Sequence, residues 1–177
     1  APGNSVGTLH VLGDAAFAPN ATYAVQLGPN VTSDQIMLGG TLYAAGTVGL
    51  SLDGASATVG QNYRIATAAL GIQGTFDQLD APDFGTLGAV YPFLMPELVY
   101  GADTVDVAMT RSGIAFAAAA TTRNQAAIAG MADSTGFDNA AVAALTGLNV
   151  ATAPAAFDAL AGDFYPTLDT VIQQQSI

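Results

Sequence analysis

Hydrophobic and polar residues alternate in a series of short runs along the first 110 residues. These runs are rich in Val, Leu, Ile, Thr and Tyr, and Gly, Pro, Asn and Asp residues separate them. Because successive side chains of a strand point to opposite faces, the alternation predicts strands that turn one set of side chains inward. The strands are expected over residues 7–11, 22–27, 35–38, 47–52, 63–68, 98–100 and 105–109.

The intervals between these runs are irregular and wider than the roughly 8–12 residues of a simple hairpin stack. Wide intervals favour a solenoid, in which each coil pairs only with its neighbours and an open terminal edge must be capped. We therefore expect a mainly β region over about residues 1–110, formed by the terminal coils of a parallel β-helix with a cap. A β-sandwich followed by helices is the alternative.

The inward positions of the expected strands form the predicted folding core. A buried face needs large apolar side chains at every second position, together with the aromatic residue of a bend. The residues that meet this description are Leu9, Val11, Tyr23, Val25, Leu27, Ile36, Leu38, Leu50, Ile65 and Phe76.

The composition changes after Arg111, where alanine becomes the dominant residue. Alanine is the best helix former, and apolar residues recur at helical intervals from Ile114 to Met131. A second helix is expected over residues 137–145, with Asp138 at its start and Gly147 at its end. Residues 111–177 are thus predicted to form a short helical region.

Charge and composition exclude several classes of function. The chain has 177 residues, 51% of them hydrophobic and 10% charged, which is not the composition of a disordered tail. Three basic residues against 14 acidic ones give a net charge of −11. Such a chain would be repelled by a nucleic-acid backbone or an anionic lipid surface, so we expect no nucleic-acid partner. Cysteine is absent, which means simply that the sequence offers no disulfide or thiolate metal site, and which is also consistent with a protein that crosses an oxidising compartment unfolded.

Candidate catalytic residues are sparse. His10 is the only histidine, and no Gly-x-Ser-x-Gly nucleophile motif accompanies it, so we interpret it as a surface strand residue. The Asp103/Asp106 pair could suggest acid–base chemistry. It lies near Gly101, where aspartate is favoured as a turn former and solvated charge. No catalytic residue is therefore assigned, and the region is predicted not to be an enzyme.

Metal, cofactor and glycan sites have equally little support. Asp77, Asp80 and Asp83 could surround a cation, but they lack the order of an EF-hand and the GGxGxD repeat. The Asn20-Ala-Thr22 and Asn30-Val-Thr32 triplets fit the glycosylation pattern, yet turn formation explains them. No glycine-rich phosphate loop opens a helix, so no cofactor is expected.

Several segments resemble, in order, the C-terminal passenger region of bacterial autotransporters. The first, Ala1 to Val11, reads APGNSVGTLHV and resembles the APGNS-x-GTL-x-V signature of the family's last β-helix rungs. Asn124-Gln125 resembles the NQ of the segment between passenger and barrel. Residues 155–165 resemble the motif that immediately precedes the family's membrane barrel, but Asp163 replaces its usual Glu and Pro166 interrupts the helix that would otherwise continue. The remaining matches are APNATYAV (18–25), SDQI (33–36), GGTL (39–42), GTV (46–48), YRIATA (63–68), GTF (74–76) and FLMPELVY (93–100).

The resemblance implies a right-handed β-helix that acts as an autochaperone, a folding nucleus for type V secretion. The implied partners are the adjoining outer-membrane β-barrel and the upstream passenger coils of the same polypeptide, with self-association possible. The implied location is the bacterial cell surface or the medium, anchored through the outer membrane, and any export signal would lie upstream. A surface adhesin, for which outward Tyr43, Tyr91 and Phe93 are candidates, and an anchor for an upstream secreted hydrolase are the alternatives.

Overall fold

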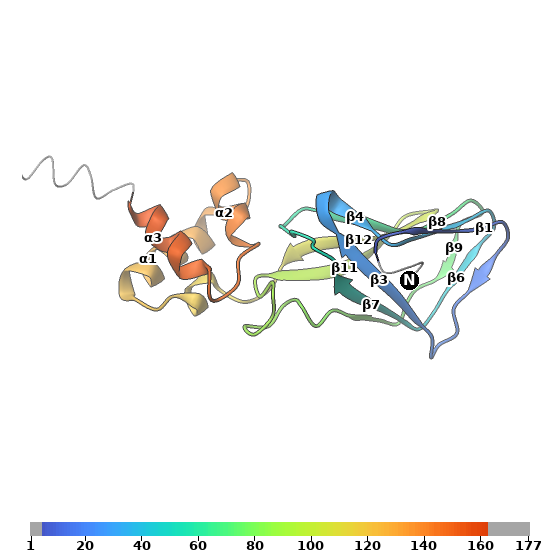
Figure 1. Ribbon diagram of the computed structural model, residues 1–177, viewed down its shortest axis with the longest axis horizontal. Helices are drawn as coiled ribbons and strands as arrows, with labels where there is room; N and C mark the ends of the chain where they lie inside the picture. The colour runs from blue at the N-terminus through green and yellow to red at the C-terminus, as the bar shows by residue number, and fades with distance from the viewer. Residues whose placement is uncertain (1–4, 163–177) are drawn as a thin grey trace, which may run out of the picture.

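The computed structural model describes residues 5–162 of the chain. Strands occupy the first part and helices the last, so the mainly β-then-α expectation is confirmed (Figure 1). The strands are β1 Thr8–Val11, β2 Ala15–Ala16, β3 Thr22–Gly28, β4 Thr32–Ser33, β5 Gln35–Leu38, β6 Leu42–Ala44, β7 Thr47–Leu52, β8 Asn62–Ala68, β9 Ile72–Gly74, β10 Gln78–Asp80, β11 Leu94–Tyr100 and β12 Thr104–Arg111. The helices are η1 Pro29–Val31, η2 Phe116–Ala119, α1 Arg123–Thr135, α2 Ala140–Leu145 and α3 Ala153–Gly162.

The chain passes through three sheets in turn and then repeats the passage, which we call a circuit. β1, β5 and β8 lie side by side in one sheet, β2, β6 and β9 in the second, and β3, β7 and β10 in the third. Within each sheet, the strands of consecutive circuits pair in parallel. A β-sandwich, the alternative expectation, has two sheets, whereas this fold has three.

Antiparallel strands interrupt this order at two places, so the sheets are mixed. β4 folds back on the end of β3. The β11–β12 hairpin adds to the first sheet, where β12 pairs antiparallel with β8 and β11 becomes the outermost strand. β1 is the outermost strand at the other side of the same sheet. The finer expectation of a parallel β-helix therefore stays a proposal.

The interior of the three sheets is a hydrophobic core that contains most of the expected inward residues. Val11 and Tyr23 are partly buried and pack against it. Leu9 is 50% exposed, which contradicts its expected burial, because β1 is an edge strand and no strand covers it within the described residues. The expected residues that are buried are Val25, Leu27, Ile36, Leu38, Leu50, Ile65 and Phe76.

The corner at Gly46, before β7, requires glycine. Gly46 has a φ of +77°, in the left-handed region that side chains rarely adopt. A Cβ atom there would lie 2.4 Å from the carbonyl oxygen of Ala21, in the neighbouring circuit. The backbones of adjacent circuits therefore approach closely at this corner.

The helices have a second hydrophobic cluster, in which Phe93, Phe116 and Phe157 are fully buried. Thr122 caps α1 in a capping box with Gln125, a pattern that starts a helix by satisfying its free N–H groups. The second helix begins later than expected: Asn139, rather than Asp138, caps it, through bonds to the first-turn amides. No helix within residues 5–162 has the length and hydropathy of a membrane span. The expectations for Asp163 and Pro166 lie outside the described residues.

Candidate functional site: corner aspartates and the Arg111 junction

Three aspartates at corners between strands tie one circuit to the next; we call Asp14, Asp34 and Asp77 the corner aspartates. Each stands immediately before a strand, respectively β2, β5 and β10. Each carboxylate accepts a hydrogen bond from a backbone N–H of the neighbouring circuit. The donors are Thr41 to Asp14 at 2.7 Å, Gly7 to Asp34 at 2.8 Å and Gly46 to Asp77 at 2.7 Å.

The donor of each bond lies beside its aspartate in the strand register. Thr8 is opposite Gln35, which places Gly7 beside Asp34. The bonds span 27 residues for Asp34 and 31 for Asp77. An ionised carboxylate can accept hydrogen bonds but cannot donate them, so it needs an N–H group opposite it. A shift of one residue in the pairing of two strands would remove that donor and turn every inward side chain outward. The corner aspartates therefore favour one alignment of successive circuits.

Asp34 is the most enclosed of the three, with 0% exposure. Its second oxygen accepts a hydrogen bond from the Gln26 N–H at 3.0 Å, so one side chain connects the start of β1, β3 and β5. Burial of the nearby Tyr23 ring, reinforced by the Asp34 charge, raises the pKa of the Tyr23 phenol well above its ordinary value. The neutral hydroxyl donates to the Ile65 carbonyl at 2.7 Å.

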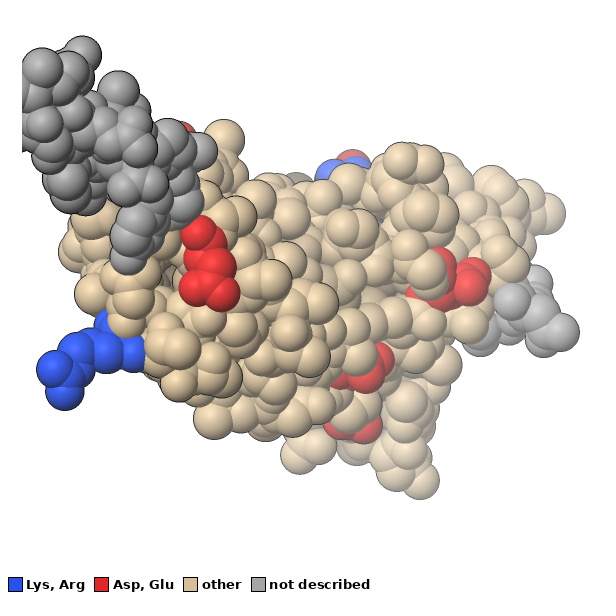
Figure 2. Space-filling view, turned by 60° about the vertical axis from the view of Figure 1, so that its left-hand side comes forward, with Lys and Arg blue, Asp and Glu red and all other residues tan. Residues whose placement is uncertain are grey.

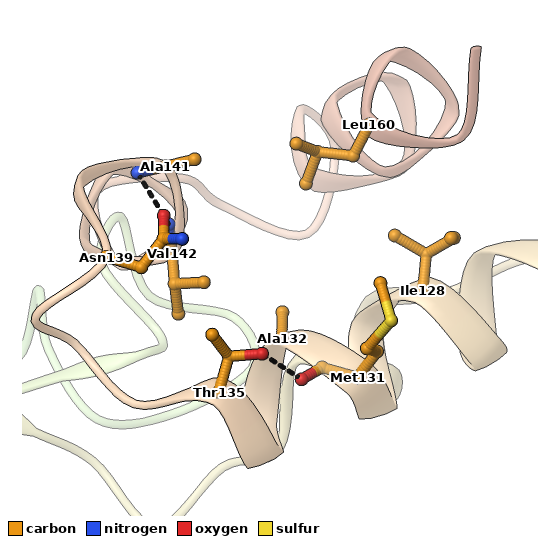
Figure 3. A pocket seen from close by; sticks show the side chains of 8 residues that line it. All are labelled: Ile128, Met131, Ala132, Thr135, Asn139, Ala141, Val142 and Leu160. Atoms are coloured by element: carbon orange, nitrogen blue, oxygen red, sulfur yellow. Dashed lines mark hydrogen bonds between the residues drawn. The ribbon is translucent and has the colours of Figure 1, made fainter. Parts of the chain in front are cut away.

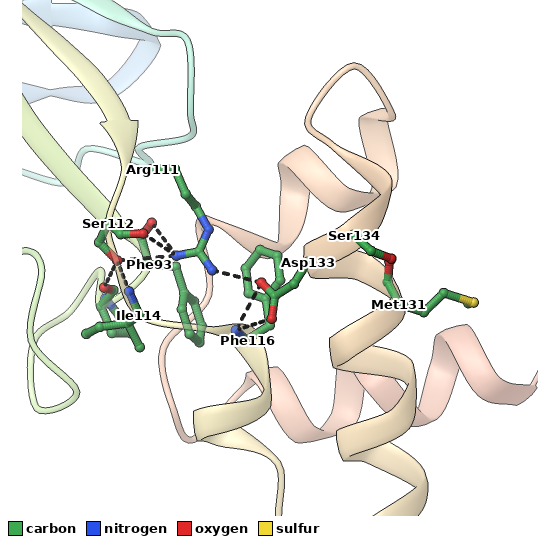
Figure 4. A network of polar contacts seen from close by, with 9 residues as sticks. Phe93, Arg111, Ser112, Ile114, Phe116, Met131, Asp133 and Ser134 are labelled. Atoms are coloured by element: carbon green, nitrogen blue, oxygen red, sulfur yellow. Dashed lines mark hydrogen bonds and ion pairs between the residues drawn. The ribbon is translucent and has the colours of Figure 1, made fainter.

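Arg111, the last residue of β12, links the strands to the helices (Figure 4). One guanidinium nitrogen, Nη1, donates to the carbonyl oxygens of Phe93 and Ser112, each at 3.1 Å. Its other nitrogen, Nη2, donates to Asp133 Oδ1 on α1 at 3.1 Å. The guanidinium also lies 4.2 Å from the centroid of the Phe116 ring, within the range of a cation–π interaction.

Asp133 completes this Arg111 junction from the helical side. Its carboxylate accepts the Phe116 N–H at 3.0 Å, so it also holds the first residue of η2. Burial lowers the pKa of Arg111, and the hydrogen bond and charge of Asp133 oppose that effect. An arginine remains charged at neutral pH, so this pair is an ion pair with only 15% and 25% of its side chains exposed.

We expect Arg111→Lys to loosen the helices from the strands. A lysine ammonium cannot reproduce the planar fork that reaches Phe93, Ser112 and Asp133 together, so about 1–2 kcal/mol should be lost locally. Limited proteolysis should then cut faster within residues 112–162 while strand amides keep their hydrogen-exchange protection. Arg123→Lys, at the exposed first residue of α1, is the matched control. Equal cleavage of both variants would contradict the role given to Arg111.

The residues considered for catalysis do not form a site together. His10 is exposed on β1, and Asp103 is exposed before β12. Asp106 pairs instead with Arg64 directly opposite on β8, a cross-strand ion pair. Asp80 is exposed on β10. Among residues 5–162, no three acidic or histidine side chains gather as a metal ion would require.

The two glycosylation-like triplets lie in turns or next to them. Asn30 has a φ of 55°, a left-handed conformation that asparagine tolerates better than most residues. Thr32 donates its hydroxyl to the Pro29 carbonyl at 2.7 Å across the same turn. Asn20 is an exposed turn residue before β3. These local bonds agree with the turn-forming interpretation.

A hollow of about 320 Å³ lies among the three α-helices (Figure 3). Ile128 and Met131 from α1 and Leu160 from α3 point toward one another across it, and Val142 of α2 lines its other side. Its polar lining residues are Thr135 and Asn139, and each is bonded to nearby backbone. The lining carries no group able to act as an acid, base or nucleophile at neutral pH.

The face seen in Figure 2 is mostly uncharged, with acidic groups scattered singly and one arginine protruding at the helical end. Acidic residues exceed basic ones 14 to 3 in the whole sequence. The resulting net charge of −11 favours solubility.

The sequence did not predict that Asp34 connects two circuits or that Arg111 connects the strands to the helices. In the sequence, Asp34 stands out only as part of the SDQI match, and Arg111 only as the point where composition changes. Arg111 had one usable signal, because it is one of three cations and aromatic residues Phe93, Phe116 and Phe137 flank it in the sequence. Nothing local distinguished Asp34 from the other turn-forming aspartates.

Comparisons with known proteins give a partial match. No family model matches the chain. It is 33% identical over 138 residues to an extracellular serine protease of Serratia marcescens, covering 73% of this chain and 12% of that protein. A second extracellular serine protease of the same organism is 31% identical over 136 residues, covering 72% of this chain and 12% of its own length. The chain is therefore similar to a small part of these secreted enzymes.

Proposed function

We propose that this chain is the C-terminal part of an autotransporter passenger, and that it nucleates folding of the coils that precede it. In this proposal, β1 to β10 form three coils of a right-handed parallel β-helix and the β11–β12 hairpin is its cap. The helical region beyond Arg111 connects the cap to an outer-membrane barrel. The domain boundary near residue 110 belongs to the same proposal.

The observation that carries the proposal is the parallel register repeated in all three sheets. The two outermost strands of the first sheet, β1 and β11, also differ in character. Pro96 and Glu97 lie on the outermost strand β11. A proline cannot donate a ladder hydrogen bond and a charge discourages edge pairing, so β11 is protected against an added strand. β1, at the opposite end, has neither a proline nor an acidic residue. Within this first sheet, addition of a further strand is therefore favoured at β1 rather than at β11.

The comparisons support this interpretation without extending to the whole protein. Both relatives are named as extracellular serine proteases, and the chain spans 12% of their length. We propose an extracellular location for this chain and place proteolytic activity, where a related polypeptide has it, outside the matched region. A surface location anchored through the outer membrane follows from the autotransporter resemblance.

A folding nucleus is physically reasonable because each coil of a solenoid contacts only its neighbours. A terminal unit that is already stable offers the next coil a template, so folding can proceed coil by coil without an energy source outside the cell. The buried inward residues and the corner aspartates supply that stability and alignment. Anchoring an upstream hydrolase is the second candidate, favoured by the names of the relatives. Both roles require the same stable cap.

The adhesin alternative has less support. Tyr91 and Phe93 are buried at 7% and 0% exposure, so they are not available for an outward binding surface. Tyr43 is 42% exposed on β6, so it alone of the three candidates faces outward. One partly exposed tyrosine is an ordinary feature of a protein surface.

The proposed function is tested with Ile65→Ala in the complete polypeptide. Ile65 is fully buried, and its truncation should cost about 3 kcal/mol through the cavity that it leaves. Surface display, measured by antibody labelling of intact cells at equal expression, should fall several-fold. Asn62→Ala, at an exposed position of the same strand, should leave display unchanged. Normal display by Ile65→Ala, with a lowered melting temperature of the isolated chain, would show that stability of this region does not drive secretion.

A further inference from the structure

The β1 end of the strand region has an apolar hollow of about 400 Å³. Leu9 of β1, Phe17 of the corner before β3, Tyr23 of β3 and Ile36 of β5 form its apolar wall. None of the lining residues carries a charge. This hollow lies at the end that the hairpin does not close.

The walls of the hollow are held in place from the neighbouring circuits. The ring centroids of Phe17 and Tyr23 are 5.3 Å apart, and Phe76, two circuits further along, lies 5.3 Å from Phe17. The Tyr23 hydroxyl is fixed by its bond to the Ile65 carbonyl. β2 contributes only two alanines to this circuit. Because the rings are fixed and the nearby strand has small side chains, the hollow cannot close by a simple shift of its walls.

We infer that a preceding coil of the same polypeptide covers this hollow and inserts one large apolar side chain into it. The inference rests on the proposed function, since it needs a preceding coil. β1 and β2 are the outermost strands of their sheets, in parallel alignment with β5 and β6, and can accept another strand of the same direction. The matched relatives leave most of their length outside the region shared with this chain, which provides room for such coils.

The hollow selects the coil that it accepts by the size and polarity of one inward residue. A leucine, isoleucine or aromatic side chain would gain contacts with Leu9, Phe17 and Tyr23 and would remove their exposed surface from water. An alanine would leave a void, and a charged residue would be buried without a partner. Backbone hydrogen bonds along β1 alone would not distinguish a coil with a large apolar residue from one with an alanine or a charged residue. The proposal thus identifies the preceding coil by one bulky apolar residue facing the hollow.

The first test compares Leu9→Lys with Val99→Lys in the complete polypeptide. Leu9 and Val99 are 50% and 48% exposed, but Val99 lies on β11 at the protected end. A lysine at residue 9 can extend into solvent in the isolated chain, yet it would meet the inserted side chain in the complete polypeptide. Amide hydrogen exchange in the preceding coil should become at least about tenfold faster for Leu9→Lys, as expected when burial of one large apolar side chain is lost. Val99→Lys should not change it.

The second variant, Leu9→Trp, fills the hollow from within. The melting temperature of residues 1–177 alone should rise, while protection of the preceding coil should fall because the inserted side chain is displaced. Unchanged protection of that coil in both Leu9 variants would overturn the inference. A second result would also overturn it: residues 1–177 form a dimer that Leu9→Lys dissociates, and the β1 amides exchange equally fast in the complete polypeptide and in the isolated chain. The hollow would then be covered by a second copy of the chain. If Ile65→Ala lowers display in that case, only the hollow inference fails and the proposed function stands.

Discussion

Leu50→Asp is expected to unfold the strand region and abolish display of the complete polypeptide. Leu50 lies on β7, in the middle circuit, and its side chain is 4% exposed in the core. Its parallel neighbour Val25 is also buried, so the new carboxylate would have no polar partner. An unpaired charge in such a place costs more than about 5 kcal/mol, which equals much of the stability of an ordinary domain.

The measurement for Leu50→Asp is far-ultraviolet circular dichroism of the isolated chain, followed by surface labelling of cells that express the complete polypeptide. Ser51→Asp is a matched control, since it adds the same charge at the next residue of β7, which is exposed. We expect Ser51→Asp to fold and to be displayed normally. A folded Leu50→Asp chain would show that the middle circuit is not the packed core that the burial indicates.

The strand pattern could be predicted because alternation is a local property. The residues on either side of Leu50 and Ile65 are enough to predict that both side chains face inward, and both are buried. The same rule failed for Leu9, because alternation tells which face a side chain occupies but not whether another strand covers that face. Strands as short as β2, with two residues, have no periodicity to detect.

The candidate site was less accessible to sequence reasoning because its contacts are distant in the chain. Asp133 lies 22 residues beyond Arg111, and nothing in the intervening alanine-rich segment indicates that their side chains meet. Asp34 reaches Gly7 across 27 residues. Such a bond depends on the register between circuits, which is fixed only once both circuits have folded. Local pattern therefore predicts elements and faces, whereas the connections between circuits need the structure.

Asp34→Ala is expected to cost about 4 kcal/mol, the second-largest effect among these changes. The substitution removes the acceptor of two backbone N–H groups, those of the part-buried Gly7 and Gln26, from a position where the aspartate itself is fully buried. Each buried donor left without a partner costs about 1–3 kcal/mol. Asp34→Asn should lose about half as much, because its amide oxygen can accept one N–H while its amino group faces the other.

The loss of stability in the Asp34 variants should be concentrated in one part of the fold. Truncation of an ordinary core residue would not give such a local effect. Gly7 immediately precedes β1, so the Asp34 variants should expose the amides of β1 to exchange before those of β7 or β8. Thermal unfolding gives the total loss, and hydrogen exchange gives its distribution. Asp80→Ala, which removes an exposed carboxylate on β10, should change stability by less than about 0.5 kcal/mol. If Asp34→Ala weakened all strands equally, Asp34 would be one more part of the core. Early opening of β1 alone would instead identify Asp34 as the residue that keeps the outermost strand aligned with β5.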